Sequence, residues 1–286
     1  MIVQPLLSVL MTAYNREKYI VEAIESVLAS TYTNFELIIV DDCSNDTTPH
    51  ILRHFAEKDN RVSIYFNKEN LGDYPNRNKA ATYAKGEYIM FVDSDDMILK
   101  DGFEKCINAM EAFPKISFGM YYNKMTHSPF VLLSEEAIRK HFFETPFLII
   151  GPGGTIQRRF FFNQINGYPE KYGPANDMYY NLKAVSITPV LLLPHEFMYY
   201  RRHEGQEINN SAAYLYQSYI YFNDALNDLN LPLSKKEVIW LRKKNKRRFA
   251  VNIIKYFFKT QSISETRKVL KKTDFGYRDF FQGVFH

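Results

Sequence analysis

The first hundred residues of this 286-residue chain predict an α/β fold, in which helices cover both faces of a parallel sheet. Short β-branched and aromatic runs alternate there with segments whose apolar residues recur at helical spacing. One such run, residues 88–92, ends directly in the carboxylates of Asp93, Asp95 and Asp96. Because open α/β sheets bind ligands at the carboxyl ends of their strands, this acidic edge is the expected functional site.

The expected elements of this half follow one another in regular order. Strands are predicted at 8–12, 36–40, 62–66 and 88–92, and helices at 20–28, from residue 48, and at 77–85. Thr48 is the expected N-cap of the second helix, with Pro49 in its first turn. Gly86 is the expected C-cap of the third helix.

After residue 96 the pattern is less regular. Helices are predicted at 103–110 and 177–184, and strands at 118–124, 190–193 and 197–201. The apolar run 147–150 leads into the glycine-rich segment 151–154. That segment is either a plain backbone turn or a place where a ligand approaches the chain closely.

The composition is that of a globular protein, with 46% hydrophobic and 24% charged residues. Cys43 and Cys106 are too few for a disulfide framework or a thiolate metal site, which favours a reducing compartment such as the cytoplasm. The apolar first nine residues lack the basic start and cleavage site of a signal peptide. No apolar stretch approaches the roughly 18 residues that a membrane span needs.

The charge is unevenly distributed along the chain. Residues 234–286 carry 15 Lys or Arg and 4 Asp or Glu, whereas the preceding part is net acidic. Leu231–Leu233 is therefore the expected boundary of a basic extension, and Ser234 with Glu237 forms a capping box for its first helix. The apolar stripe of that helix is expected at Val238, Leu241, Phe249, Ile253 and Phe257.

Three interpretations of this basic extension remain open. It could contact an anionic membrane surface, pack on the acidic body or on a second subunit, or attract nucleic acid. No nucleic-acid-binding motif accompanies the charge, so nucleic acid is the least favoured partner.

The carboxylates that follow residue 92 are chemically informative. Clustered carboxylates repel one another unless a cation lies between them, and oxygen ligands of this kind suit Mg²⁺ or Mn²⁺. An ion held by few carboxylates usually completes its shell with phosphate oxygens. The alternative is a solvated acidic loop.

The end of the first strand argues against one common function. Residues 12–16 have no G-x-G-x-x-G turn, which weighs against a dinucleotide-dependent dehydrogenase. Tyr14 could instead stack on a base, and Asp42 could accept a hydrogen bond from a ribose hydroxyl or a base N–H. The alternatives are a packed tyrosine and a helix-capping aspartate.

Taken together, these segments resemble the inverting family 2 glycosyltransferases, which have the GT-A fold. The matching stretches are 8–15, 38–44, 70–72, 77–78, 84–89 and 93–96. The resemblance is dense from about residue 6 to 100 and persists, more thinly, to about residue 205. It implies a GT-A domain over 1–230, with a nucleotide-binding half (1–100) and an acceptor half (101–230), followed by the basic helical extension 231–286.

The resemblance also implies roles for individual residues. The nucleotide pocket, most often for uridine, would be lined by Thr12, Ala13, Tyr14, Asp42 and Arg77, with Asp93 near the ribose. Asp95 would hold the metal on the diphosphate. His203 matches a position where many relatives have a histidine near the metal, although the serines that commonly follow it are absent; the alternative is a structural histidine.

The same resemblance identifies a catalytic base. Family members place an aspartate at the N-terminal end of a helix in the second half, usually after a glutamate; here the match is Asp177, after Asn176. Gly153 and Gly154 match a glycine pair that lies beside the donor sugar and the acceptor in family members. Asn176 would lie beside the same two substrates. The alternatives are a helix cap at Asp177 and a plain turn at the glycines.

The function implied is transfer of a sugar from a nucleotide diphosphate donor, favouring UDP, to a hydroxyl of a glycan or lipid-linked acceptor. The cofactor would be Mn²⁺ or Mg²⁺, and the setting polysaccharide assembly. Residues 234–272 would give a cytoplasmic protein peripheral contact with the inner face of the membrane. The alternatives are a sugar-nucleotide pyrophosphorylase, which should carry a phosphate loop at residues 12–16, and a non-catalytic nucleotide-binding scaffold.

Overall fold

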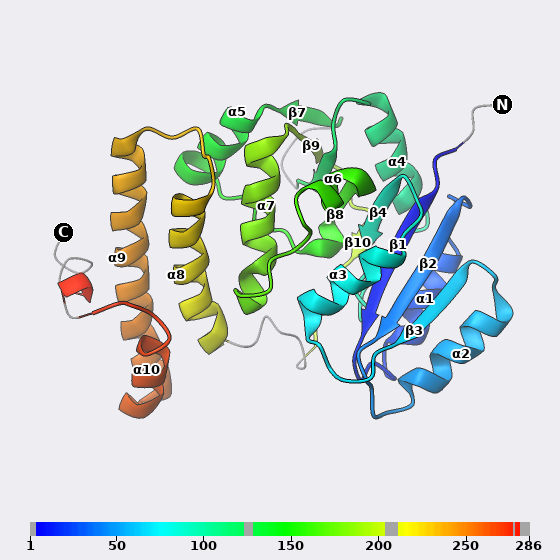
Figure 1. Cartoon of the computed structure of the whole chain (residues 1–286), viewed down its shortest axis with the longest axis horizontal. Coiled ribbons are helices and arrows are strands. Elements are labelled where there is room, and N and C mark those ends of the chain that lie inside the picture. Colours follow the sequence, from blue (N-terminus) through cyan, green and yellow to red (C-terminus); the bar gives the residue numbers. More distant parts are fainter. Residues whose placement is uncertain (1–3, 123–127, 204–210, 277, 281–286) are drawn as a thin grey trace.

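The computed structural model describes residues 4–122, 128–203, 211–276 and 278–280 (Figure 1). Within these residues the main sheet has eight strands in the order β3-β2-β1-β4-β8-β6-β9-β7. The strands of this sheet are β1 Leu7–Ala13, β2 Phe35–Asp41, β3 Val62–Phe66, β4 Tyr88–Phe91, β6 Phe118–Tyr121, β7 Phe130–Leu132, β8 Thr155–Arg158 and β9 Val190–Leu193. Two short strands, β5 Met97–Ile98 and β10 Met198–Tyr199, form a separate antiparallel pair.

Helices flank this sheet on both sides. The α-helices of the body are α1 Ile20–Leu28, α2 Thr48–Lys58, α3 Asp73–Tyr83, α4 Gly102–Ala112, α5 Ser134–Arg139, α6 Arg159–Gln164 and α7 Asn176–Ile187. A short 3-10 turn, Pro152–Gly154, precedes β8. The C-terminal helices are α8 Ser211–Asp228, α9 Lys235–Thr260 and α10 Ile263–Leu270. The α/β prediction is confirmed.

The sheet is mixed, as the resemblance to the GT-A fold implies, and the parallel part predicted for the first hundred residues is confirmed. Strands β3, β2, β1 and β4 are parallel, whereas β8 runs antiparallel to both β4 and β6. The turn Pro152–Gly154 explains the reversal. It lies at the carboxyl end of β4, where the Cβ of an alanine at Gly153 would be 3.7 Å from the carbonyl oxygen of Phe91. The chain therefore enters β8 from the carboxyl edge and returns along β4.

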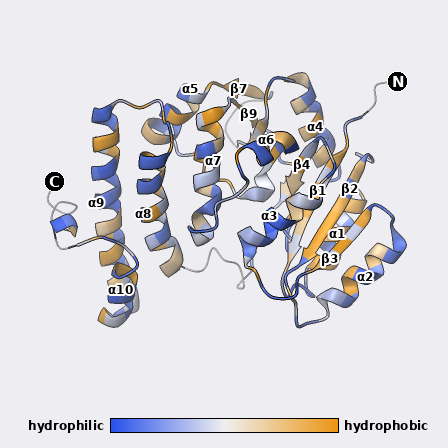
Figure 2. Ribbon diagram, viewed as in Figure 1, coloured by the Kyte–Doolittle hydropathy of each residue, from blue (hydrophilic) through white to orange (hydrophobic). Residues whose placement is uncertain are grey.

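Alternate residues of the central strands supply two apolar cores. Val9 and Met11 of β1 belong to the core that contains α1 and α4, whereas Leu10 belongs to the core that contains α3, α6 and α7. A strand buried on both faces reads as a continuous apolar run, which is why periodicity identified these strands so clearly. Figure 2 shows the hydrophobic strands β1–β3 beside helices whose other faces are hydrophilic.

The basic extension packs on the body. Helix α8 lies between α7 and α9 (Figure 1). Tyr221 and Phe222 of α8 and Leu241 of α9 join the α7 side of the main core, while Phe249 and Ile253 join a smaller core with α10. The expected capping box is confirmed: Glu237 N–H donates to Ser234 Oγ, and Ser234 N–H donates to the Glu237 carboxylate.

Some expectations for this extension differ from the structure. Phe257, placed in the apolar stripe, is exposed at the end of α9. The sequence did not predict α8 at all. Leu231–Leu233 connects α8 to α9, and the domain boundary placed there stays a prediction. Among the described helices, none combines the length and the apolar character needed to cross a bilayer.

Two local predictions were wrong. Thr47, not Thr48, occupies the N-cap position of α2, and Thr48 Oγ1 instead accepts a hydrogen bond from Arg16 N–H at 2.8 Å. Helix α3 ends at Tyr83, before Gly86. Gly86 has a packing role: its N–H donates to Ser8 Oγ at 2.8 Å, and its backbone lies against β1.

Two expected strands are shorter than predicted. Strand β6 ends at Tyr121, and positions 123 and 124 of the predicted strand lie outside the described residues. The strand expected at 197–201 is limited to Met198–Tyr199, because only these residues pair with β5.

We predict that Gly86→Ala destabilises the fold by about 2–3 kcal/mol. A Cβ at this position would lie 2.6 Å from both Leu6 O and Ser8 N, which are backbone atoms that cannot move without displacing β1. Urea unfolding measures the effect. Gly276→Ala is the matched control, since its Cβ would contact only Asp279 Oδ2 at 3.8 Å. Equal stability of the two variants would contradict the packing role.

Candidate functional site

The carboxyl ends of β1, β2 and β4 bring together the residues singled out in the sequence. Ala13 at the end of β1 is paired with Asp41 at the end of β2. Val92 N–H, just after β4, donates to Leu10 O of β1. Because the three strands are parallel and adjacent, the loops that contain residues 12–16, 42–48 and 93–96 meet at one edge.

The loops after β1 and β2 are tied to each other. Asn15 N–H donates to Ser44 Oγ at 2.9 Å, and Asn45 N–H donates to Asn15 Oδ1 at 2.8 Å. Asn15 has a φ of 52°, a left-handed conformation that asparagine tolerates. Tyr14 is 42% exposed on these loops. Its ring is therefore accessible to a planar ligand.

Asp42 organises the loop that leads into α3. Its Oδ1 accepts from Leu71 N–H and from Asn67 Nδ2, and its Oδ2 accepts from Gly72 N–H at 2.9 Å. Gly72 has a φ of 89°, which favours glycine. Three hydrogen bonds leave lone-pair capacity on Oδ2, so a base or ribose donor can still be accepted there.

Arg77 of α3 is a buried cation at the centre of the edge. Its Nε donates to Asp73 Oδ1 at 2.8 Å, and its Nη2 forms an ion pair with Asp93 Oδ1 at 2.7 Å. Its Nη1 is buried without a hydrogen-bond partner. Buried donors are rarely left unpaired, and guanidinium groups bind phosphate well. This free donor therefore suits a bound phosphate group.

Asp95 lies beside His203, 108 residues away in the chain. The distance between Asp95 Oδ2 and His203 Nε2 is 2.9 Å, and the His203 ring stacks on Tyr19 at 4.5 Å between centroids. The antiparallel pairing of β5 with β10 brings the two segments together. Arg201 strengthens the contact, because its Nε donates to Asp95 O at 3.0 Å.

This pair fits a divalent ion only in part. Among the described residues, no three His, Cys, Asp or Glu side chains lie close enough to hold a metal ion by themselves. A carboxylate and an imidazole are nevertheless suitable ligands for Mn²⁺, and Mg²⁺ or Mn²⁺ at such sites takes its remaining ligands from phosphates and water. The donor set therefore fits an ion that arrives with a diphosphate.

Asp96, the third carboxylate of the cluster, points elsewhere. It is buried, and its Oδ1 accepts from Arg201 N–H at 3.0 Å. Burial, with a smaller contribution from the nearby Asp93 carboxylate, raises the pKa of Asp96 to about 7. Asp96 therefore anchors the segment that carries His203.

Asp177 lies in the first turn of α7 and is 9% exposed. Its Oδ1 accepts from Met178 N–H at 2.7 Å, and a Cβ on Gly151 would be 3.7 Å from its Oδ2. Burial raises the pKa of Asp177 to about 7; Arg77 lowers it, and Asp73 raises it. The structure thus brings the carboxylate expected to act as base to the glycine-rich turn.

The glycine pair and Asn176 have evident structural roles. A Cβ on Gly154 would be 2.2 Å from Ile150 Cγ2, so the turn requires a residue without a side chain here. Gly153 lies beside Met198 of β10 and the end of β4. Asn176 is buried, and its Oδ1 accepts from Tyr172 N–H at 2.9 Å. Contacts of these three residues with sugar or acceptor stay predictions.

Sequence reasoning missed three residues of this site. Asp73 pairs with Arg77, and their i, i+4 spacing was the available signal. Arg16 lies 3.7 Å from Asp95, and Arg201 binds the backbone of the same residue. These two contacts join distant segments, so no local pattern could have identified them.

The edge defined by these residues belongs to an α/β sheet of the GT-A type, and the comparisons with known proteins agree. The sequence model described as "Glycosyl transferase family 2" matches residues 8–165, more than half of the chain. The chain therefore belongs to glycosyl transferase family 2.

Two curated relatives are bacterial. The chain is 37% identical over 146 residues to TuaG of Bacillus subtilis, named as a teichuronic acid biosynthesis glycosyltransferase, covering 48% of this chain and 58% of that protein. It is 39% identical over 119 residues to glycosyltransferase GlyG of Streptococcus pneumoniae, covering 41% and 40%. The chain thus spans about half the length of these relatives.

Solved structures confirm the fold. The crystal structure of TarS 1–349 from S. aureus matches with a TM-score of 0.68 and 22% identity, over 97% of this chain and 80% of that one. The mannosyltransferase PcManGT of Pyrobaculum calidifontis, with GDP-Man and Mn²⁺, matches with a TM-score of 0.66 and 16% identity, over 95% and 80%. The expected GT-A fold is therefore confirmed.

We predict that Asp177→Asn changes the free energy of unfolding more favourably at pH 8 than at pH 5. The difference between the two pH values should be roughly 2–3 kcal/mol. A carboxyl whose pKa is raised on folding binds its proton more tightly in the folded state. Its stabilising effect is full below pH 4 and is lost as the pH rises to about 7. Asparagine keeps the acceptor for Met178 N–H and removes the charge.

Denaturant unfolding at the two pH values measures this difference. Asp59→Asn is the control, because a hydrogen bond from Arg61 holds the pKa of Asp59 below its usual range. The cost of that substitution should be the same at pH 5 and pH 8. A pH-independent effect of Asp177→Asn would show that its carboxyl is not desolvated.

Proposed function

We propose that this protein is a metal-dependent, inverting glycosyltransferase. It transfers a sugar from a nucleotide diphosphate donor, with UDP the favoured carrier, to a hydroxyl of a glycan or lipid-linked acceptor in polysaccharide synthesis. One observation carries the proposal. In a family 2 fold, the buried Arg77 presents an unpaired donor at the strand edge where Asp93 and Asp95 lie, within electrostatic range of the desolvated Asp177.

The residues of this edge supply the donor site. Tyr14 offers an exposed ring for the base, and Asp42 retains capacity to accept a hydrogen bond. Thr12 and Ala13, at the end of β1, would line the nucleotide pocket beside Tyr14. Structures of TarS with UDP and with UDP-GlcNAc, and of PcManGT with GDP-Man, support a nucleotide-sugar donor in this fold.

Asp95 and His203 would hold a Mn²⁺ or Mg²⁺ ion against the diphosphate. Bound there, the ion would neutralise the charge that develops on the leaving diphosphate. Arg77 and Arg16 add fixed positive charge on the same side. Asp95 lies within 4 Å of both His203 and Arg16, so the proposed metal ligands and one of these cations are close together.

Asp177 is the proposed general base. It would accept the proton of the attacking acceptor hydroxyl while the acceptor oxygen forms a bond to the anomeric carbon. The bond from that carbon to the diphosphate oxygen breaks, and its electron pair leaves with the diphosphate. A pKa of about 7 keeps a useful fraction of Asp177 ionised near neutral pH, yet makes it basic enough to accept a proton.

The setting is proposed to be the cytoplasm, with residues 234–272 in peripheral contact with an anionic membrane. The outer side of α9 supports this, because Trp240 is 48% and Phe258 71% exposed among lysines and arginines. Lys244 also lies over the Trp240 ring at 4.8 Å. Co-sedimentation with phosphatidylglycerol vesicles would test the contact, and absence of binding at low salt would refute it.

We predict tight binding of one nucleoside diphosphate only when a divalent ion is present. The measurement is calorimetric titration of UDP, GDP, ADP and CDP, each with and without Mn²⁺. Asp95→Ala should abolish the metal-dependent part of the affinity, at least tenfold. The matched control is Asp101→Ala at the N-cap of α4, where the exposed carboxylate forms an ion pair with Lys105 at 2.9 Å. Unchanged binding by Asp95→Ala would refute the metal assignment.

We also predict that Asp177→Asn lowers kcat by about 10²–10⁴-fold and changes nucleotide affinity less than twofold. The wild-type kcat/KM should rise as the pH increases through about 7, because Asp177 acts only when ionised. Steady-state release of the diphosphate in the presence of acceptor measures both effects. Activity retained by the variant would place the base on another residue.

A further inference from the structure

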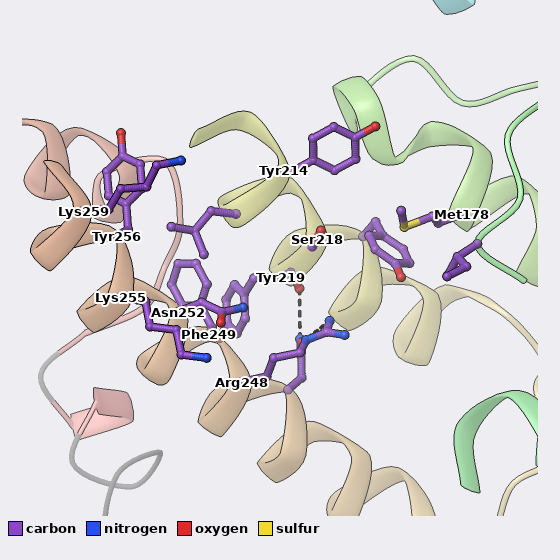
Figure 3. Close-up of a pocket in the computed structure, with 14 residues that line it drawn as sticks. Met178, Tyr214, Ser218, Tyr219, Arg248, Phe249, Asn252, Lys255, Tyr256 and Lys259 are labelled. Carbon is purple, nitrogen blue, oxygen red and sulfur yellow. Dashed lines mark hydrogen bonds between the residues drawn. The ribbon is translucent and has the colours of Figure 1, made fainter. Parts of the chain in front are cut away.

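A groove of about 540 Å³ runs along the joint between α8 and α9 and reaches Met178, the residue that follows Asp177 in α7. Figure 3 shows Met178, the residue after Asp177, at one end of the groove, Arg248 near its middle, and Lys255 and Lys259 at the other end. The volume lies within the range of small-molecule sites. The groove is therefore large enough for several units of an extended ligand.

Two lining residues relate the groove to the proposed reaction centre. Ile149, which lines it, lies two residues before Gly151, and Gly151 faces Asp177 Oδ2. Tyr221 also lines the groove. Burial raises the pKa of Tyr221 to about 12, with Arg248 opposing and Asp177 adding to the shift, so both charged groups act on this hydroxyl.

The positive groups of the groove form one row. Arg248, Lys255 and Lys259 all lie on α9, at positions i, i+7 and i+11, which fall on one side of a helix. The helical rise spreads them over about 16 Å. The described lining contains no Asp or Glu, so the row has no negative partner there.

A buried asparagine holds the Arg248 side chain in place. Its Nη2 donates to Asn245 Oδ1 at 3.0 Å, and the Asn245 side chain is buried. Asn245 Nδ2 in turn donates to Tyr219 O and to Asn223 Oδ1, both at 3.1 Å. A buried amide fixed at both ends orients the guanidinium, which is what a preorganised anion site requires.

The floor of the groove is apolar and aromatic. Leu215 and Phe249 contribute aliphatic and aromatic carbon, and several tyrosines line the walls. Tyrosine combines a flat apolar face with a hydroxyl, so it can contact both the C–H groups and the hydroxyls of a sugar or polyol. A floor of this kind with cations along one side suits an extended chain that is both hydroxylated and acidic.

We propose that this groove binds the acceptor, and that the acceptor is an acidic glycan or polyol chain with an anionic group on successive units. The inference rests on the proposed function, since it takes Asp177 as the base. The spacing of the cations favours a chain over a single headgroup. One diphosphate cannot contact three cations spread over about 16 Å of helix, whereas a phosphodiester or carboxylate on each repeating unit can.

The experiment measures binding without nucleotide. Fluorescently labelled hexamers of galacturonate, of glycerol phosphate and of neutral maltose units are titrated with the full chain by anisotropy. We expect at least one acidic hexamer to bind about tenfold more tightly than the neutral one, and salt to weaken it. The two acidic probes distinguish carboxylate from phosphodiester recognition. Equal affinity for all three would overturn the inference.

Matched variants locate the binding. Lys255→Gln with Lys259→Gln should lower the affinity for the acidic hexamer about tenfold, and Lys255→Arg with Lys259→Arg should retain it. The control, Lys236→Gln with Arg247→Gln, removes the same charge from exposed positions of α9 outside the groove, and should change affinity less than twofold. Equal losses from the groove and control variants would show general charge attraction and overturn the inference.

Two further outcomes are decisive. Farnesyl diphosphate that displaces the acidic hexamer at equal concentration would assign the groove to a lipid diphosphate and overturn the acidic-chain proposal. Failure of every nucleoside diphosphate to bind, with hexamer binding intact, would refute the glycosyltransferase proposal but leave an acidic-chain site. Nucleotide binding without hexamer binding would refute the acidic-chain site and leave the glycosyltransferase proposal intact.

Discussion

The buried ion pairing of Arg77 is the interaction on which the site depends. A guanidinium cannot be desolvated without partners, and here Asp73 on its own helix and Asp93 after β4 provide them. The rings of Tyr74 and Phe91 lie within 6 Å of the same group. This single cation therefore fixes α3 against β4, and it sets the electrostatic environment that Asp177 experiences.

The second half of the site reaches this cation because the sheet is mixed. The chain turns at Pro152–Gly154 and enters β8 antiparallel to β4. Helix α7 then places Asp177 opposite that turn. The small β5–β10 pair carries His203 to Asp95. A wholly parallel sheet would require a long crossover at each of these steps, whereas the antiparallel return needs only a short turn.

Sequence reasoning succeeded where the determinant is local. Strands buried on both faces produce apolar runs, so β1, β2, β3 and β4 and the carboxylates after β4 were identifiable, and Asp177 followed from the family motif. It failed where the determinant is long-range: Gly86 was taken for a helix cap because its real constraint, the backbone of β1, is 78 residues away. Helix α8 is rich in tyrosine and polar residues, so its amphipathic pattern is weak, and only packing between α7 and α9 reveals its buried face.

The uneven charge of the chain gains a physical meaning from this arrangement. In the proposed reaction, carboxylates at the strand edge would hold a cation or act as the base, whereas the cations Arg248, Lys255 and Lys259 line the groove on α9. Cations placed next to Asp177 would lower its pKa and weaken it as a base. Cations displaced along the helix can attract an anionic chain while the carboxylate remains desolvated. The separation of acidic body and basic helix is thus consistent with one reaction that uses two anionic substrates.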